Sequence, residues 1–141
     1  MRVEDLKPGT VIRYPYLWSW QEAQGETEGR KSRPVCMVYS QRDPSKGITH
    51  LFLLAISSTP PLATQDALAV PLLDRTRAGL GEWKEAWITI GESNYDVVEK
   101  SHYLDLNQAI MGKFSPSFLR TVAAAFRDAL IRGARRVDRT L

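Results

Sequence analysis

The residue types that most often carry chemistry are scarce in this chain of 141 residues. It has a single cysteine, Cys36, and its only histidines are His50 and His102. Since no acidic residues stand at ligand spacing around them, the sequence does not predict a metal site. It also lacks a glycine-rich phosphate loop, a His-Glu-x-x-His pair and a nucleophile elbow. The sequence therefore gives no sign of a metalloprotease, a P-loop enzyme or a serine hydrolase.

The surroundings of these residues favour structural roles. Cys36 lies in the apolar stretch 35–38, so we expect a small buried side chain and not a reactive thiol. His50 opens an apolar run and is expected to be structural. Glu4 and Asp5 stand where a secretory signal would be apolar, and no run approaches the roughly 20 apolar residues of a membrane helix. A soluble, cytoplasmic protein is expected, which the single cysteine also fits.

Aromatic and basic residues permit contact with nucleic acid. Trp18 and Trp20 begin a polar segment, 18–32, that we expect to be a loop. Exposed, these rings could each stack on an RNA base for about 1–3 kcal/mol; buried, they would pack the loop against the fold. The net charge of +3 owes much to a group of arginines near the C-terminus: Arg127, Arg132, Arg135, Arg136 and Arg139. They form either a solvated tail or an electrostatic footprint for RNA, DNA or an acidic partner.

Short strands are the main elements that must position these residues. β-branched and apolar runs predict strands over 10–17, 34–40, 50–56, 68–73, 85–90 and 94–98. The run 50–56 is apolar on both faces, which predicts a central strand. Pro71 places the strand over 68–73 at an edge of the sheet, and the cluster 43–47 predicts a turn.

One amphipathic helix follows these strands. Ser115 suits the N-cap, Pro116 the first helical position and Gly133 the C-terminal cap. Apolar residues recur between them at three- and four-residue spacing, which predicts a helix over 115–132 and a basic tail over 134–141. The whole predicts a single domain, 1–141, mainly β with a C-terminal helix and arranged as a small barrel or sandwich. An alternating βαβ fold is disfavoured because no second helix is evident between the strands.

A succession of short motifs is similar to one known family. The motifs are Pro8-Gly9-Thr10 before the first strand, Glu28-x-x-x-x-Arg33-Pro34 before the second, Ile56-Ser57-Ser58 at the end of the third, then Ile90-Gly91-Glu92 and Gly112-Lys113-Phe114. From Gly9 to about Leu130 their order resembles the toxin family of PemK, Kid and MazF. The resemblance implies an SH3-like barrel of the CcdB and PemK type that forms a homodimer.

The resemblance also implies an activity. Typical members are metal-independent endoribonucleases of type II toxin–antitoxin systems, which cleave single-stranded RNA through the ribose 2′-hydroxyl and are neutralised by a cognate antitoxin. Arg33 and Ser57 match catalytic positions of the family, and Glu92 could supply the acid found after the fifth strand. A guanidinium can direct two N–H groups at a phosphate. Residues expected to bind RNA are Trp18, Trp20, Arg30, Lys31, Ser58 and Thr59.

Structural alternatives exist for the two best-matched positions. Arg33 could form an ion pair with Glu26 or Glu28 across the end of the loop. Ser57 could instead hydrogen-bond within its own turn, as serines at strand ends often do. Neither side chain is a good general base at neutral pH.

Two departures from the family pattern support a second hypothesis. Thr27 stands where some members use a histidine, and Ile90 where some use an arginine. They favour a non-catalytic PemK-like module that binds nucleic acid or a protein partner. Cleavage of RNA in the presence of EDTA distinguishes the two hypotheses.

Overall fold

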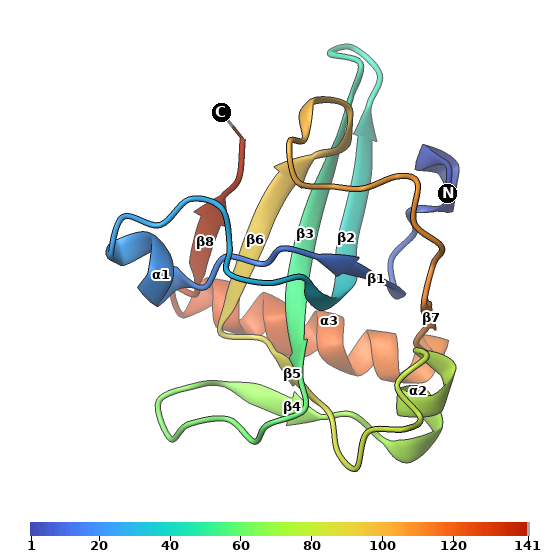
Figure 1. Ribbon diagram of the computed structural model, residues 1–141, viewed down its shortest axis with the longest axis vertical. Coiled ribbons are helices and arrows are strands. Elements are labelled where there is room, and N and C mark those ends of the chain that lie inside the picture. Colours follow the sequence, from blue (N-terminus) through green and yellow to red (C-terminus); the bar gives the residue numbers. More distant parts are fainter. Residues whose placement is uncertain (141) are drawn as a thin grey trace.

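The structure is a computed structural model that describes residues 1–140 (Figure 1). It contains one eight-stranded sheet, formed by β1 Thr10–Tyr14, β2 Arg33–Asp43, β3 Ile48–Ser57, β4 Ala67–Ala69, β5 Trp87–Thr89, β6 Glu92–Val97, β7 Gly112–Lys113 and β8 Arg135–Asp138. The helices are α1 Ser19–Ala23, α2 Leu72–Arg77 and α3 Pro116–Ile131, with 3₁₀ turns at Val3–Asp5 and Val98–Lys100. The expectation of a mainly β protein with a C-terminal helix is confirmed.

The strand β3 lies at the centre of the sheet. The strands follow the order β4-β5-β3-β2-β1-β7, and β6 pairs with both β3 and β8. Pairing is antiparallel except between β6 and β8, which run parallel. Since β3 pairs with β2, β5 and β6, the central position predicted from its two apolar faces is confirmed.

Alternate side chains of β3 face two separate groups of buried residues. Leu54 packs with the buried face of α3, which lies across one side of the sheet (Figure 1). Leu53 points the other way, into a cluster that includes Tyr14. Cys36 belongs to the first cluster, and burial raises the pKa of its thiol to about 12. The expected role of Cys36 as a small buried side chain is confirmed.

The helix α3 begins and ends at the predicted signals. The hydroxyl oxygen of Ser115 accepts a hydrogen bond from the backbone N–H of Phe118 at 3.2 Å, and Pro116 occupies the first helical position. Gly133 follows the helix with a φ of 92°, a conformation that glycine adopts without steric cost.

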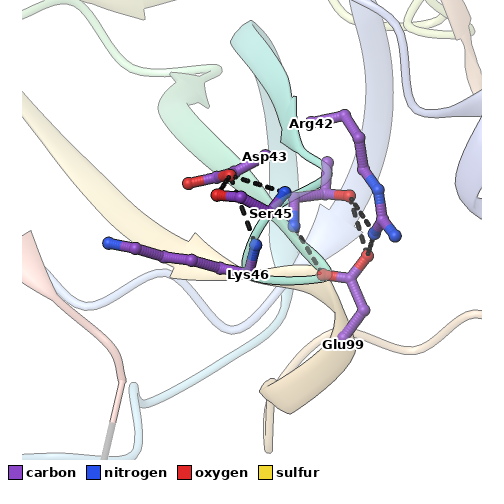
Figure 2. Close-up of polar contacts among 6 residues, drawn as sticks. Arg42, Asp43, Ser45, Lys46 and Glu99 are labelled. Carbon is purple, nitrogen blue, oxygen red and sulfur yellow. Dashed lines mark hydrogen bonds and ion pairs between the residues drawn. The ribbon is translucent and has the colours of Figure 1, made fainter.

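Polar contacts fix the turn between β2 and β3, as the sequence predicts (Figure 2). The carboxylate of Asp43 accepts hydrogen bonds from the hydroxyl and the backbone N–H of Ser45 at 2.7 and 3.1 Å. On the neighbouring side, Glu99 accepts from Arg42 at 2.9 Å and from the backbone N–H of Thr49 at 2.6 Å. The two bonds to Glu99 attach the β2–β3 hairpin to the 3₁₀ turn Val98–Lys100.

The structure differs from the expected strand over 68–73. The strand β4 ends at Ala69, and Pro71 caps the short helix α2. Proline has no N–H for a sheet, but its fixed φ suits a helix start. Asp74 of α2 is buried and accepts a hydrogen bond from the backbone N–H of Ser115 at 2.6 Å. The edge position of β4 was predicted correctly, but its length was not.

Two more segments are more ordered than expected. The helix α1 interrupts the expected loop over 18–32. Within the expected basic tail, 134–141, Arg135–Asp138 form β8 beside β6. Val137 of this strand is buried, while its neighbours Arg136 and Asp138 are exposed. Leu141 lies outside the described residues. Together with α2 and the short β7, α1 and β8 are the strands and helices that the sequence pattern did not indicate, so the expectation of no second helix between the strands was wrong.

Candidate functional site

A small cavity is lined in part by Trp18, the residue that directly precedes α1. Its volume is about 190 Å³, and it brings together the end of β3, the turn that follows, β4 and β5. Ser57 and Thr59 line it together with Trp18, so three of the sequence-predicted site residues share one cavity. The remaining lining residues are Pro60, Pro61, Leu62, Gln65, Ala67, Trp87 and Thr89.

Arg33 lies against the same tryptophan. Its guanidinium carbon is 5.1 Å from the ring centroid of Trp18, a distance typical of a cation–π contact. Burial lowers the pKa of Arg33 from its ordinary value, although a guanidinium stays protonated at neutral pH. The Nε atom of Arg33 is buried and has no hydrogen-bond partner among residues 1–140. Arg33 therefore presents a partly desolvated cation beside Trp18.

The ion pair considered as an alternative for Arg33 is not formed. Glu26 instead accepts both hydrogen bonds of a two-pronged pair with Arg30, each 2.9 Å long. Glu28 makes no ion pair with Arg33 in the described part of the chain. The positive charge of Arg33 is thus not neutralised by either loop carboxylate.

Ser57 forms the contact that its structural alternative predicts. Its hydroxyl oxygen accepts a hydrogen bond from the backbone N–H of Thr59 at 3.0 Å, within the turn after β3. A serine hydroxyl that accepts one bond still carries its own proton. Ser57 can therefore donate to a group in the cavity without losing its contact in the turn. Ser58 and Thr59 are exposed beside it.

Glu92, at the start of β6, is hydrogen-bonded to residues on either side of Trp18 in the sequence. One carboxylate oxygen accepts from the hydroxyl of Tyr16 and from the backbone N–H of Ser19, and the other accepts from the hydroxyl of Ser19, all at 3.0 Å. Burial raises the pKa of Glu92, while these hydrogen bonds act in the opposite direction. The ring of Tyr16 meets that of Trp18 edge-on, 5.0 Å between centroids. Glu92 is therefore placed to hold the neighbours of Trp18.

Glu92 lines a second cavity and not the one with Ser57. This second cavity has a volume of about 360 Å³ and includes Ser19 and Glu92. The two cavities share Gln65 and Thr89, so they lie next to each other. The structure therefore does not bring Glu92 into the same cavity as Ser57.

The other expected RNA-binding residues lie apart from both cavities. Trp20 is 45% exposed on α1, and the guanidinium of Arg30 lies 4.8 Å from its ring centroid. Lys31 is exposed in the segment before β2. Lys31 follows Arg30 in the sequence, and the charge of Arg30 is paired with Glu26.

Thr27 and Ile90, the two positions at which the sequence departs from the motifs it resembles, both make structural contacts. Ile90 is 3% exposed in the core below α3, and the backbone oxygen of Thr27 accepts from Arg139 at 3.2 Å. His50 lies 2.6 Å from the hydroxyl of Tyr95, and neither His50 nor His102 lines the cavity with Ser57.

The sequence did not single out the residue that fixes the loop carrying Trp18. Arg139 is 3% exposed, and its guanidinium donates to the backbone oxygens of Pro15, Thr27 and Glu28 at 2.8 to 3.3 Å. It also covers the ring of Tyr103 at 3.9 Å. These acceptors lie on both sides of α1. The alternation of exposed and buried residues in 135–139 is a strand signal, but it cannot identify which arginine is buried.

Among residues 1–140, no group of three or more His, Cys, Asp or Glu side chains could hold a metal ion. No helix in the same range is long and apolar enough to cross a membrane.

No protein-family model, curated protein or solved structure matches this chain.

Proposed function

We propose that this protein is a metal-independent endoribonuclease that cleaves single-stranded RNA through the ribose 2′-hydroxyl, on a barrel of the SH3-like type. The observation that carries the proposal is the guanidinium of Arg33, which forms no ion pair with a carboxylate among residues 1–140 and which lies 5.1 Å from the Trp18 ring that borders the cavity with Ser57. A cation, an aromatic face and a hydroxyl are the groups that recognise a phosphate next to a base.

The chemistry assigns a role to each of these groups. Attack of the 2′-oxygen on the adjacent phosphorus forms a 2′,3′-cyclic phosphate and breaks the bond to the 5′-oxygen. The proton of the 2′-hydroxyl would pass to solvent water, and the leaving 5′-oxygen would take a proton from solvent water. Negative charge grows on the non-bridging oxygens in the transition state. Arg33 would direct N–H groups at those oxygens, and the hydroxyl of Ser57 would donate a further hydrogen bond. Losing one such donor typically slows an enzyme about 10²–10³-fold.

Glu92 is given a positioning role in this proposal. All three of its hydrogen bonds go to Tyr16 and Ser19, on either side of Trp18. Its carboxylate would keep the indole ring next to Arg33. Catalysis would then depend mainly on charge stabilisation and not on a dedicated general base.

The biological setting follows from the resemblance of the sequence motifs. We propose a place in a type II toxin–antitoxin system, with a homodimer as the active form and a cognate antitoxin as its inhibitor. Trp20, Arg30 and Lys31 would extend the RNA contact beyond the cavity, since exposed aromatic and basic side chains bind single strands.

A second candidate function is RNA binding without cleavage. It is favoured by the burial of Ile90 and by the hydrogen bonds that occupy both oxygens of Glu92. A protein of this kind would bind RNA with an affinity that falls steeply as salt is added.

Incubation with RNA separates the two functions. The purified chain is mixed with a panel of single-stranded RNAs of varied sequence in EDTA, and product ends are analysed. The proposal expects fragments with 2′,3′-cyclic phosphate and 5′-hydroxyl ends. Salt-sensitive binding with no fragments from any RNA supports the second function and contradicts the first.

A further inference from the structure

A larger groove lies away from the Trp18 cavity, between α3 and the outer parts of β2, β3 and β6. Its volume is about 570 Å³, against about 190 Å³ for the cavity with Ser57. Its apolar lining includes Val38, Phe52, Phe126 and Leu130. Grooves of about 300–1,000 Å³ with apolar walls are typical of small-molecule sites.

Aromatic rings form one wall of this groove. Phe52 stands at the centre, with its ring centroid 6.2 Å from Tyr39, 5.4 Å from Tyr95 and 6.3 Å from Phe126. Tyr39 is 57% exposed and Leu130, on the opposite wall, is 41% exposed. The ring of Tyr39 and the side chain of Leu130 are thus accessible to an apolar ligand. The guanidinium of Arg136 lies 5.8 Å from the ring centroid of Phe52.

The charged residues of the groove have one sign. Arg127 and Arg136 line it, and no aspartate or glutamate does. The guanidinium of Arg136 lies 4.4 Å from the ring centroid of Tyr95. Among residues 1–140 its one ion pair is with the carboxylate of Asp138, 4.0 Å away, and both side chains are half exposed. An exposed ion pair of this kind contributes little to the free energy of folding. Arg127 is in no ion pair among residues 1–140.

We propose that this groove binds an aromatic carboxylate of low molecular weight. Its ring would lie against Phe52 and Leu130, and its carboxylate would accept hydrogen bonds from Arg127 and Arg136. Both arginines supply planar N–H forks that match a carboxylate. A second copy of this chain is a poorer occupant, because two-fold pairing of this groove would bring its like charges together.

Binding of 2-naphthoate to the purified full-length protein tests the proposal. Titration calorimetry, with chemical shifts of backbone amides to locate the ligand, is compared with 2-naphthylmethylammonium, which has the same ring and the opposite charge. We expect naphthoate to bind with the shifts centred on 38–52 and 123–136. We expect Arg127→Gln and Arg136→Gln each to weaken it about tenfold. Arg120→Gln removes the same charge from an exposed position of α3 outside the groove and should leave the affinity unchanged.

Three results would overturn the proposal. The first is equal binding of the ammonium probe, which would make the groove merely apolar. The second is undiminished naphthoate affinity in both arginine variants. The third is sedimentation of the wild type as a dimer together with no detectable binding of naphthoate. None of these readouts depends on ribonuclease activity.

Discussion

The guanidinium of Arg139 donates a hydrogen bond to the side-chain oxygen of Asn94, 3.0 Å away. The same oxygen accepts from the backbone N–H of Leu17 at 2.9 Å, and the Asn94 amide donates to the Leu17 carbonyl at 2.7 Å. Leu17 directly precedes Trp18. The residue after β8 and a buried side chain of β6 therefore fix the backbone next to the candidate site.

Replacing Arg139 should loosen the loop that carries Trp18. Arg139→Met removes donors from three backbone oxygens and from Asn94. Buried acceptors left unpaired predict a loss of about 2–4 kcal/mol in the free energy of unfolding. Hydrogen exchange should also speed up over 15–30, and tryptophan fluorescence should shift.

Arg135→Met is the matched control for that change. Arg135 is exposed on β8, four residues before Arg139, and its side chain makes no hydrogen bond in the described part of the chain. We expect its loss to change the free energy of unfolding by less than about 0.5 kcal/mol. If both substitutions changed the free energy of unfolding equally and left hydrogen exchange over 15–30 unchanged, the positioning role of Arg139 would be contradicted.

Glu92 should make the stability depend on pH in an unusual direction. The ordinary pKa of a glutamate is 4.5, and burial raises the pKa of Glu92 in the folded protein. Between these two pKa values the folded state binds more protons than the unfolded state, so this group's contribution to stability falls as pH rises. Glutamine does not titrate. The free energy of unfolding of the wild type relative to Glu92→Gln should therefore decrease as pH rises above 4.5. Denaturant unfolding at several pH values measures this difference, and an increase over that window would contradict the assigned environment.

Gly112 should not tolerate a side chain. A Cβ atom there would collide with the backbone oxygen of Arg77 and lie 2.9 Å from the Cα of Ala78. Because backbone atoms cannot move aside cheaply, Gly112→Ala should destabilise the fold by about 1–3 kcal/mol or more. Gly81→Ala is the control, since its Cβ would meet nothing closer than 3.8 Å. Thermal unfolding compares the two, and similar melting temperatures would show that β7 does not pack against α2 as described.

Local signals predicted the elements that the sequence specifies by itself. The caps of α3, the turn over 43–47 and the central position of β3 each follow from a few neighbouring residues. The strand over 68–73 was predicted too long because its apolar pattern suits both a strand and the start of α2. In the fold the strand ends at Ala69, and Pro71 is the N-cap of α2.

The candidate site was harder to predict because its residues meet through the tertiary fold. Ser57 and Trp18 were both named from the sequence, and they line one cavity although they are far apart in the chain. Glu92 was grouped with them, but it lines the neighbouring cavity. The role of Arg139 depends on carbonyl groups of distant loops, which leave no pattern in the side-chain sequence.

The rate of RNA cleavage by Arg33 variants tests the central claim most directly. Single-turnover cleavage in EDTA is measured for the wild type, Arg33→Ala and Arg13→Ala, where Arg13 is an exposed arginine on β1. The substrate is one RNA with either ribose or 2′-deoxyribose at the scissile position. We predict that the wild type and Arg13→Ala cleave only the ribose form, and that Arg33→Ala is slower by at least about 100-fold. Cleavage of the ribose form by Arg33→Ala at the wild-type rate, or cleavage of the deoxyribose form, would contradict the proposed role of Arg33.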